Sequence, residues 1–490
     1  MTRSSQPRPI LTVTEMAATD RAAVAAGVPA TTLMERAGQG VTDAITERFK
    51  PGRAVIYCGP GDNGGDGYVV ARRLAEAGWT VAVAPIAPPA TEAAIAMAGL
   101  WSGEQITPEA GQEADLYVDA MFGAGLARPL GGEAARIAAH LSTVAERVVA
   151  IDLPSGLPGD GGLPAGACGR AALTVTFHAR KPAHVLEPGR GRCGEVRVID
   201  IGLPALDATL FENDPDLWLS RFPWPGPATH KHARGRMAVV SGPLASTGAA
   251  RLAARAGLRV GAGVVTVLSP LDAVAVNAAH LEAIMLRGFE TDAELEDLAA
   301  ELDSAVIGPA AGVNETTVGR VLALARTGAA LVLDADAITV FRDDPEDLFS
   351  VLDRDDVLTP HAGEFGRLFP GLLEASPERI SAVRAAAAQA DAVVLLKGPD
   401  TVVAAPDGRC AVNLNGSAWL ATAGTGDVLS GLVAGLIAQG MESFEAACAA
   451  AYIHSAAAEL QGPGLIAEDL PGLVPAVLRG LYADARRPGA

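Results

Sequence analysis

The amino-acid sequence predicts an α/β protein of two tandem domains, each built around a largely parallel sheet. The chain has 490 residues, about three times the ~150 residues of a typical domain, so we expect more than one domain. Short β-branched runs alternate with helical patterns along both halves, which is typical of parallel sheets with helices on their faces. A proline-rich segment at 214–234 interrupts this alternation. We therefore place the boundary there and expect domains at 1–221 and 222–490.

In the first half, the alternation predicts a doubly wound parallel sheet. We expect strands at 53–58, 79–84, 115–120, 147–152, 173–177 and 195–199. We expect helices between several of them, at 68–77, 92–100 and 133–141. Glycine, aspartate or proline follows each strand, at the sheet edge where such folds bind their ligands.

The second half repeats the pattern after the proline-rich segment. We expect strands at 236–241, 263–268, 305–308, 330–334, 357–359, 392–397 and 401–404. We expect helices at 248–258, 294–302, 316–327, 378–389, 428–437 and 443–459. The apolar stretch 428–441 is too short to cross a bilayer, so we interpret it as a buried helix. The tail after Tyr482 is expected to fray.

The composition limits the partners and the compartment. With 38 basic and 57 acidic residues, the formal net charge is −19, which argues against a broad nucleic-acid or anionic-membrane surface. The five cysteines are scattered and form no CxxC pair, and the N-terminus has no apolar signal segment. We therefore expect a cytoplasmic protein with reduced thiols.

Lysine is rare in this chain, because only four of the 38 basic residues are lysines. Lysine and arginine are not interchangeable at a phosphate or a tight turn, so each lysine is a candidate for a specific role. Three of them, Lys181, Lys231 and Lys397, lie inside motifs described below, whereas Lys50 does not.

A glycine-rich loop at 59–67, GPGDNGGDG, follows the first strand. Five glycines in nine residues before a helix would let a ligand approach the backbone closely and would point N–H groups at an anion. The loop's carboxylate and amide oxygens are also ligands that hard cations prefer. A simpler interpretation, a glycine-rich turn with capping Asp and Asn side chains, stays open.

Two aspartates end later strands of the same half. Asp119 precedes the turn MFGAGL, and Asp152 precedes LPSGL. Because the carboxyl ends of parallel strands meet at one edge, both could converge on the glycine-rich loop. A lone strand-end Asp is more often a capping residue, and Lys181 in FHARKP could equally be a solvated surface residue.

Together, GPGDNGGDG, VDAMFGAGL and IDLPSGL resemble the NAD(P)H-hydrate epimerase domain over about residues 10–215. The resemblance implies a Rossmann-like domain that binds hydrated NADH and NADPH (NADHX and NADPHX), with Asp152 facing the substrate and relaying a proton. The implied substrate-binding residues are Asp62, Asn63, Gly64, Gly65, Asp66, Gly123, Ala124, Gly125, Leu126, Ala127, Arg128, Pro129 and Asp152. The implied potassium ligands are Asn63, Asp119 and Ser155.

The second half carries a second anion-binding pattern. The segment AGTGD, ending at Asp427, leads into the apolar helix, so its glycines would expose N–H groups at a helix N-terminus. A carboxylate beside such an anion hole suits phosphoryl transfer, in which an acid accepts the proton of the attacking hydroxyl; Asp427 could also simply cap the helix. His361 at a strand end favours ligand contact over a structural turn, and Lys397 ends another strand.

HKHARG, STGAA, LDADAI, LTPHAGEF, LLKGPDT and GTGD, in this order, resemble the ADP-dependent NAD(P)H-hydrate dehydratase of the ribokinase-like fold over about residues 222–485. The resemblance implies an α/β/α sandwich in which Lys397, Gly398, Pro399, Asp400, Thr401 and Gly426 contact the nucleotide. It places Ala249, Gly312, His361 and Asp427 at the substrate, with Asp427 as the catalytic base. One departure is GPAAG where the family has GPGLG, because Ala310 replaces a glycine.

The two resemblances imply one bifunctional repair enzyme. The first domain would interconvert the R and S epimers, and the second would use ADP with Mg²⁺ to dehydrate the S epimer, giving AMP and phosphate. We also expect K⁺ in the first domain and a homo-oligomer. Two alternatives stay open: the second half as a kinase of a hydroxymethylpyrimidine-like compound, and the first half as a non-catalytic binding module.

Overall fold

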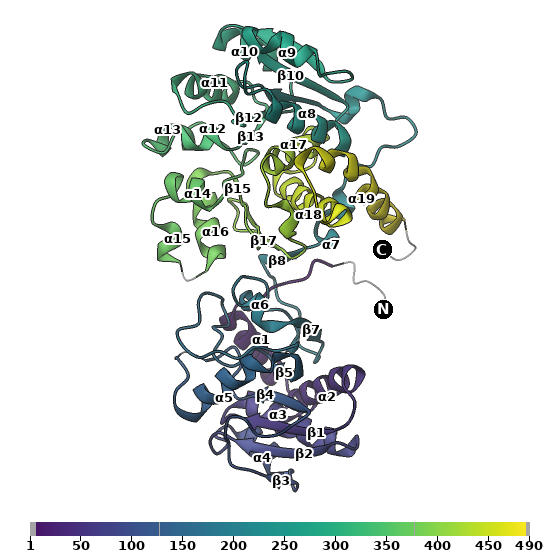
Figure 1. Cartoon of the computed structure of the whole chain (residues 1–490), viewed down its shortest axis with the longest axis vertical. Coiled ribbons are helices and arrows are strands. Elements are labelled where there is room, and N and C mark those ends of the chain that lie inside the picture. The colour runs from purple at the N-terminus through teal and green to yellow at the C-terminus, as the bar shows by residue number, and fades with distance from the viewer. Residues whose placement is uncertain (1–5, 127, 377, 487–490) are drawn as a thin grey trace. The chain divides into compact units, whose positions relative to one another are not determined.

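The computed structural model describes residues 6–126, 128–376 and 378–486. They form two compact units (Figure 1): residues 9–208, and residues 209–486 together with 6–8. The sequence boundary at 221/222 therefore falls inside the second unit. The reason is strand β8 (Leu210–Asn213), which pairs with β17 (Cys410–Asn413) and so belongs to the second sheet.

The first unit contains a parallel sheet of seven strands in the order β3-β2-β1-β4-β5-β6-β7. The strands are β1 (Arg53–Cys58), β2 (Thr80–Pro85), β3 (Glu104–Gln105), β4 (Leu116–Ala120), β5 (Val148–Ile151), β6 (Leu173–Phe177) and β7 (Glu195–Ile199). The chain order reverses between β1 and β4, so the turns after these two strands leave toward opposite faces. Such a switch point opens a crevice at the carboxyl edge of the sheet.

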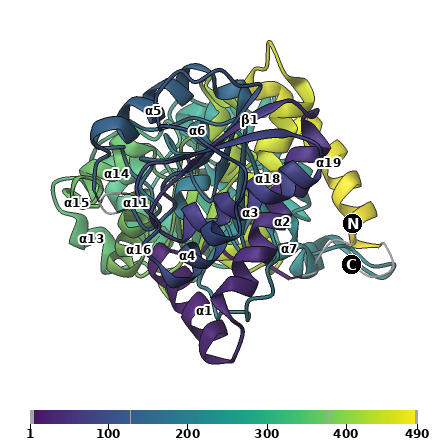
Figure 2. The ribbon, with the colours of Figure 1, turned by 90° about the horizontal axis from the view of Figure 1, so that it is seen from below.

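Helices cover both faces of this sheet. They are α1 (Val13–Ala25), α2 (Ala30–Arg48), α3 (Asp62–Glu76), α4 (Glu92–Gly99), α5 (Gly132–Thr143) and α6 (Arg190–Cys193). Alternate residues of β1 face opposite layers: Ile56 joins the core under α2, α3 and α4, whereas Tyr57 joins the core under α5. Figure 2 shows α2 and α3 side by side, in agreement with their many contacts. The sequence prediction missed α1 and α2.

Helix α3 begins at Asp62, inside the glycine-rich loop, and not at residue 68 as predicted. A Cβ on Gly64 would lie 1.9 Å from the carbonyl oxygen of Gly59, and one on Gly65 would lie 2.5 Å from Sδ of Met34. These glycines therefore let the first turn of α3 pack directly on neighbouring parts of the chain. This packing offsets the low helix propensity of glycine.

The second unit contains a mostly parallel sheet of ten strands in the order β11-β10-β9-β12-β13-β14-β15-β16-β17-β8. Its remaining strands are β9 (Arg236–Val240), β10 (Val264–Pro270), β11 (Met285–Phe289), β12 (Ser304–Ile307), β13 (Ala330–Leu333), β14 (Val357–Leu358), β15 (Val393–Leu396) and β16 (Val402–Ala404). Strand β16 runs antiparallel to both of its neighbours. The sequence prediction missed β3, β8, β11 and β17.

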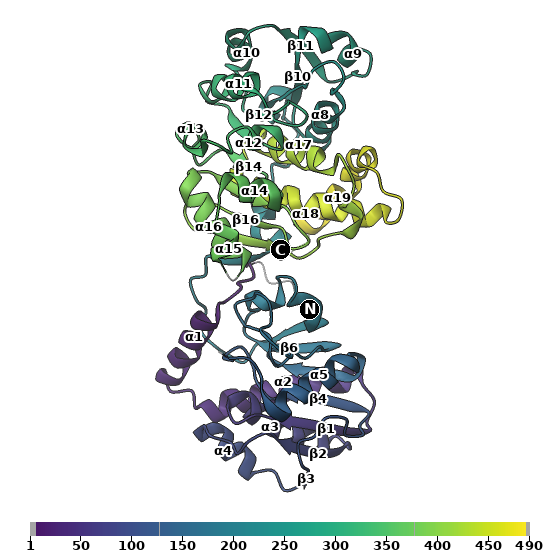
Figure 3. The ribbon, with the colours of Figure 1, turned by 60° about the vertical axis from the view of Figure 1, so that its left-hand side comes forward.

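Helices flank this sheet on both sides. They are α7 (Pro215–Trp218), α8 (Gly248–Val260), α9 (Val274–Ala278), α10 (Asp292–Ala299), α11 (Glu315–Ala325), α12 (Asp336–Thr339), α13 (Pro345–Phe349), α14 (Ala362–Leu368), α15 (Leu372–Ala375), α16 (Arg379–Ala390), α17 (Thr425–Ala438), α18 (Ser443–Gln461) and α19 (Leu470–Ala485). Figure 3 shows α17, α18 and α19 gathered with α8 on one face, where they share a core with Val239 and Val306. The chain stays helical to Ala485, three residues into the tail that we expected to fray, and residues 487–490 of that tail lie outside the described residues.

Helix α17 is buried along most of its length, as the apolar stretch predicted. A Cβ on Gly431 would lie 2.1 Å from the carbonyl oxygen of Ala253, and one on Gly435 would lie 2.8 Å from Cα of Gly257. The two helix backbones are therefore in close contact, which fixes the start of α17 against α8. In the part of the chain that the structure describes, we find no helix with the length and apolar character needed to span a bilayer.

Candidate active sites

A cavity of about 640 Å³ lies at the switch point of the first sheet. Its walls come from the start of α3, the turn after β4, the end of β5 and helix α1. The predicted residues that line it are Asp62, Asn63, Asp66, Gly123, Ala124, Gly125, Leu126, Arg128 and Asp152. The structure thus brings together three segments that are far apart in the sequence.

Asp152 forms an ion pair with Lys181 in this cavity. Its Oδ1 atom is 2.8 Å from Nζ of Lys181, whose side chain is only 2% exposed. Thr176 donates a hydrogen bond to the same oxygen, and the Ala124 N–H donates to Oδ2 at 2.7 Å. Burial tends to raise the pKa of Asp152, but the charge of Lys181 and these hydrogen bonds outweigh it and lower the pKa to about 2. Asp152 is therefore ionised near neutral pH.

His184 fixes the backbone on both sides of this pair. The Lys181 N–H donates to Nδ1 of His184 at 2.8 Å, so Nε2 carries the ring proton and donates it to the Asp152 carbonyl oxygen at 2.7 Å. Burial lowers the pKa of His184 to about 4, so the ring is neutral. Asp152 has a left-handed φ of 64°, which costs a non-glycine residue free energy. The His184 bond helps to hold this conformation.

Two further acids surround the pair. Asp66, on α3, is buried, and burial together with the charges of Asp62, Asp152 and Asp20 raises its pKa well above the usual value. Burial also raises the pKa of Asp20, on α1. The cavity therefore combines one fixed carboxylate with acids that hold their protons more readily. Sequence reasoning missed Asp20 because it missed α1.

Asp119 and Ser155 form a separate buried pair beside the cavity. The Ser155 N–H and hydroxyl donate to the two carboxylate oxygens of Asp119 at 2.8 and 2.6 Å. Burial raises the pKa of Asp119, and no described side chain forms an ion pair with it. Gly64, Gly65 and Pro129 do not line the cavity, and Ala127 lies outside the described residues.

In the second unit, the predicted anion hole is the start of α17. Gly424 caps the helix with a φ of 89°, and Asp427 lies in the first turn. Burial and the charge of Asp334 raise the pKa of Asp427 to about 6, although Lys397 opposes them. Asp427 is therefore a carboxylate that can both lose and hold a proton near neutral pH, beside backbone N–H groups.

Lys397 directly follows β15 and lies over this turn. Its Nζ atom is 2.7 Å from Oδ1 of Asp334, which directly follows β13, and 3.5 Å from where a Cβ on Gly426 would be. The pair places a positive charge beside the first N–H groups of α17, as phosphate binding requires. Asp334 was noticed only as part of LDADAI and was not predicted as a site residue.

The turn after Lys397 is rigidly held. Arg379 forms an ion pair with Asp400 at 2.8 Å and donates to the Lys397 carbonyl oxygen at 3.1 Å. Thr401 closes the turn by a hydrogen bond to the Gly398 carbonyl oxygen, and Pro399 is exposed at its tip. The Asp400 carboxylate is thus engaged inside the protein, whereas the backbone of the turn stays accessible.

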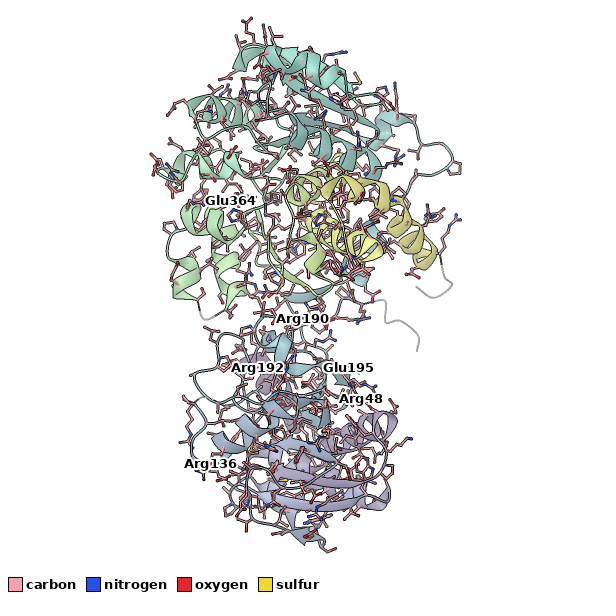
Figure 4. All side chains as sticks on the ribbon, in the orientation of Figure 1. Arg48, Arg136, Arg190, Arg192, Glu195 and Glu364 are labelled. Carbon is pink, nitrogen blue, oxygen red and sulfur yellow. The ribbon has the colours of Figure 1, made fainter. Side chains whose placement is uncertain are left out.

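His361 lies after β14, and its backbone forms an isolated parallel β-bridge with that of Lys397. Its Nδ1 accepts hydrogen bonds from the Gly363 and Glu364 N–H groups and so caps α14, and its Nε2 is 3.3 Å from Glu364 (labelled in Figure 4). Both ring nitrogens have protein partners, so the structure gives His361 a capping role. Its contact with substrate stays a prediction.

The remaining predicted residues lie on neighbouring turns. Ala249 is in the first turn of α8, and the Gly312 N–H donates to Asp336, which starts α12. Ala310 has a φ of 56°, so it adopts the left-handed backbone that the glycine of the family pattern would favour. The GPAAG segment therefore forms a turn with a left-handed residue at Ala310 although this residue is not glycine.

The chain is similar to known proteins over almost its whole length. A family model described as NAD(P)H-hydrate dehydratase matches residues 237–464, and one described as YjeF-related protein N-terminus matches residues 30–183. The bifunctional NAD(P)H-hydrate repair enzyme of Moorella thermoacetica is 37% identical over 520 aligned positions, covering 97% of each chain. That of Salinibacter ruber is 34% identical over 530 positions, covering 98% of each chain.

A solved ribokinase-like superfamily protein from Enterococcus faecalis matches the second unit. Its TM-score is 0.50 at 22% identity, and the match covers 57% of this chain and 98% of that protein. At this identity the likeness concerns the fold, and it supports the ribokinase-like architecture. The chain belongs to the family of bifunctional NAD(P)H-hydrate repair enzymes, with an epimerase domain followed by a dehydratase domain. This membership favours the bifunctional repair enzyme over the two alternatives that the sequence left open, a kinase of a hydroxymethylpyrimidine-like compound and a non-catalytic binding module.

Proposed function

We propose that the ion pair of Asp152 and Lys181 performs the epimerisation of NADHX and NADPHX. At the hydrated ring carbon, the C–O bond breaks while Lys181 donates a proton to the leaving hydroxyl. The ring nitrogen then carries a positive charge, and ionised Asp152 stabilises it. We assign the proton transfer to Lys181, and not to Asp152 as the resemblance implies, because the pKa of Asp152 is lowered to about 2. Water adds to the other face of the carbon and returns a proton to Lys181. The observation that supports this assignment is the buried 2.8 Å contact at the cavity.

For the dehydratase domain, the proposed base is Asp427. It accepts the proton of the ring hydroxyl as the oxygen bonds to the terminal phosphorus of ADP, and AMP leaves. Phosphate then leaves the ring carbon, and loss of a proton from the adjacent carbon restores the double bond. The start of α17, Gly426 and Lys397 are the proposed phosphate contacts, and the turn 398–401 is the proposed contact of the rest of the nucleotide. The raised pKa of Asp427, about 6, supports its role as base.

Potassium is the proposed ion of the epimerase domain, with Asn63, Asp119 and Ser155 as its ligands. One observation fits a cation there: the Asp119 carboxylate is buried without a cationic partner among the described residues. A Cβ on Gly123 would come within 3.1 Å of Oδ1 of Asn63, so this glycine keeps the space clear. The described residues contain no cluster of three His, Cys, Asp or Glu side chains for a metal. When bound, K⁺ would supply a positive charge that balances the Asp119 carboxylate.

Mg²⁺ with ADP as the phosphoryl donor, a homo-oligomeric state and a cytoplasmic location complete the proposal. The first rests on phosphoryl-transfer chemistry, in which Mg²⁺ neutralises the phosphates. The oligomeric state rests on the family resemblance alone. The location rests on the five free cysteines, which fit a reducing compartment.

The test of the proposed function is absorbance recovery of reduced nicotinamide from mixed NADHX epimers. The reaction is run with ADP, with ATP and without nucleotide, each with and without Mg²⁺ and K⁺. We expect complete recovery with ADP and Mg²⁺, and dependence of the R epimer on K⁺. Recovery of NADH with ATP but not with ADP would overturn the ADP assignment. Recovery of NADH from only half of the epimer mixture would overturn the epimerase assignment.

A further inference from the structure

Asp334 occupies the junction of three elements in the dehydratase domain. It follows β13, its side chain is 2% exposed, and both of its oxygens are hydrogen-bonded. Oδ1 accepts from Nζ of Lys397 at 2.7 Å and from the Ala335 N–H at 2.9 Å. Oδ2 accepts from the hydroxyl of Ser430, on α17, at 2.7 Å. The carboxylate therefore joins the end of β13 to the end of β15 and to the second turn of α17.

This arrangement determines the partner of Lys397. The ammonium group forms its ion pair with Asp334. The described residues provide no hydrogen-bond donor or ion-pair partner for the carboxylate of Asp427. Yet Lys397 and Asp427 both lie at the first turn of α17, where a Cβ on Gly426 would be 3.5 Å from Nζ. The charge of Lys397 already acts on Asp427, so without Asp334 the ammonium group would be free to pair with Asp427.

The other elements packed against Asp427 add no permanent charge that could replace Asp334. From α18, His454 is buried, and burial lowers its pKa to about 4, so it is neutral. Along α8, the residues that face α17 are small: Ala250, Ala253, Ala254 and Gly257. In the turn beside Gly424, Glu468 is exposed and Asp469 caps its own turn through the Ile466 N–H. The charges that act on Asp427 are those of Asp334 and Lys397.

We propose that Asp334 is a positioning residue of the dehydratase site: it holds Lys397 beside the anion hole and away from Asp427, so that Lys397 meets phosphate while Asp427 stays unpaired. This inference rests on the proposed role of Asp427 as the base. It assigns different roles to two aspartates: Asp427 takes part in the reaction, and Asp334 positions Lys397. Asp334 does not act as a base itself, because its oxygens already accept three hydrogen bonds.

The test compares Asp334→Asn with the wild-type full chain, using S-NADHX, ADP and Mg²⁺ over a range of pH. Asparagine removes the negative charge beside Asp427 and releases Lys397 to pair with it. Both changes favour ionised Asp427, so the acid limb of the kcat/KM profile should move to lower pH by about one unit. The KM for ADP should rise about tenfold, because Lys397 is no longer held at the phosphate. An acid limb and a KM equal to those of the wild type would overturn the proposal.

Two further variants separate a positioning role from a structural one. Asp356 is a buried aspartate of the same sheet that accepts hydrogen bonds from the Leu331 and Asp353 N–H groups, so Asp356→Asn is the matched control. It should leave the acid limb where it is. Ser430→Ala removes one hydrogen bond to Asp334 and no charge, and it serves if Asp334→Asn does not fold. It should raise the KM for ADP a few-fold at an unchanged acid limb, and an unchanged KM would overturn the proposal.

Failure of the inference can be told apart from failure of the proposed base. If Asp427→Asn kept its activity, the assignment of the base would be wrong, whatever Asp334 did. If Asp427→Asn were inactive while Asp334→Asn matched the wild type in both KM and acid limb, only the positioning role would be wrong.

Discussion

Each unit of this enzyme contains a Lys–Asp pair at the carboxyl edge of its sheet, but the two pairs are used differently. In the epimerase domain, Lys181 pairs with Asp152, the acid proposed to stabilise the charged ring, and holds its pKa at about 2. In the dehydratase domain, Lys397 pairs with the neighbouring Asp334, and the proposed base Asp427 has a pKa of about 6. The comparison teaches that the placement of one lysine decides whether an acid is a fixed charge or a titrating base.

The largest effect that we predict is the loss of dehydration in Asp427→Asn. An amide cannot accept the hydroxyl proton, so NADH recovery from S-NADHX should fall by about 10³-fold. Exchange between the epimers should continue, because Asp152 and Lys181 belong to the other unit. The measurement is initial-rate absorbance for dehydration, with chromatography of the two epimers. A variant that lost both steps would contradict the separation of the sites.

The next effect concerns stability. Lys181→Met would leave Asp152 as a buried charge without its partner, which should cost about 3–5 kcal/mol of unfolding free energy in the epimerase domain. Denaturant unfolding of the full chain, followed by circular dichroism, measures this cost. Lys50→Met is the matched control, since Lys50 is exposed and its change should stay within about 0.5 kcal/mol. Equal effects of the two substitutions would show that the Lys181 pair is not energetically important.

The acid dependence of the two steps should differ as well. Asp427 must be ionised to act as a base, so dehydration should fall about tenfold for each pH unit below about 6. Asp152 has a lowered pKa, so it stays ionised until the pH approaches about 2. Initial rates measured at about pH 8 and at about pH 5 should therefore drop for S-NADHX dehydration and stay level for epimerisation. Parallel profiles would contradict the comparison.

The smallest effect concerns two left-handed residues at strand ends. Asp152 has a φ of 64°, and its side chain makes the ion pair, whereas Ala310 has a φ of 56° and only a methyl group. Ala310→Gly should relieve the strain at little functional cost and stabilise the fold by about 0.5–1 kcal/mol. Ala385→Gly, in the middle of α16, should instead destabilise it by about 1 kcal/mol. Thermal unfolding of both variants measures the difference, and destabilisation by Ala310→Gly would contradict this explanation of GPAAG.

Much of the fold could be predicted because its strands are short apolar runs that turn at Gly, Asp or Pro. The bounds of β1, β6 and β7 are those predicted. Helix α1 was missed because it buries few residues, Met16, Thr19 and Ala23, and carries almost no apolar pattern. The edge strands β8 and β11 were missed because tertiary pairing, and not a strong local pattern, selects them.

The sequence predicted which turns form the two sites, but it did not predict which lysine pairs with which aspartate. A strand-end motif located Asp152, because parallel strands bring their carboxyl ends together, and a glycine-rich helix start located Asp427. Which acid a lysine contacts depends on packing between distant residues, and Lys397 and Asp334 are 63 positions apart in the sequence. The sequence predicts the glycine-rich loop as a place for close ligand approach. In the structure, Gly64 and Gly65 instead allow other parts of the protein to pack closely against the start of α3.

The central claim, two separate acids in two separate sites, is tested most directly by mixing two inactive variants. Full-length Asp152→Asn and Asp427→Asn are each given pure R-NADHX with ADP and Mg²⁺, first alone and then together. Alone, the first lacks the S epimer and the second lacks the dehydration step. We predict little NADH from either variant and recovery close to the wild-type rate from the mixture, because each chain supplies the step that the other lacks. A mixture no faster than its better member would contradict the account.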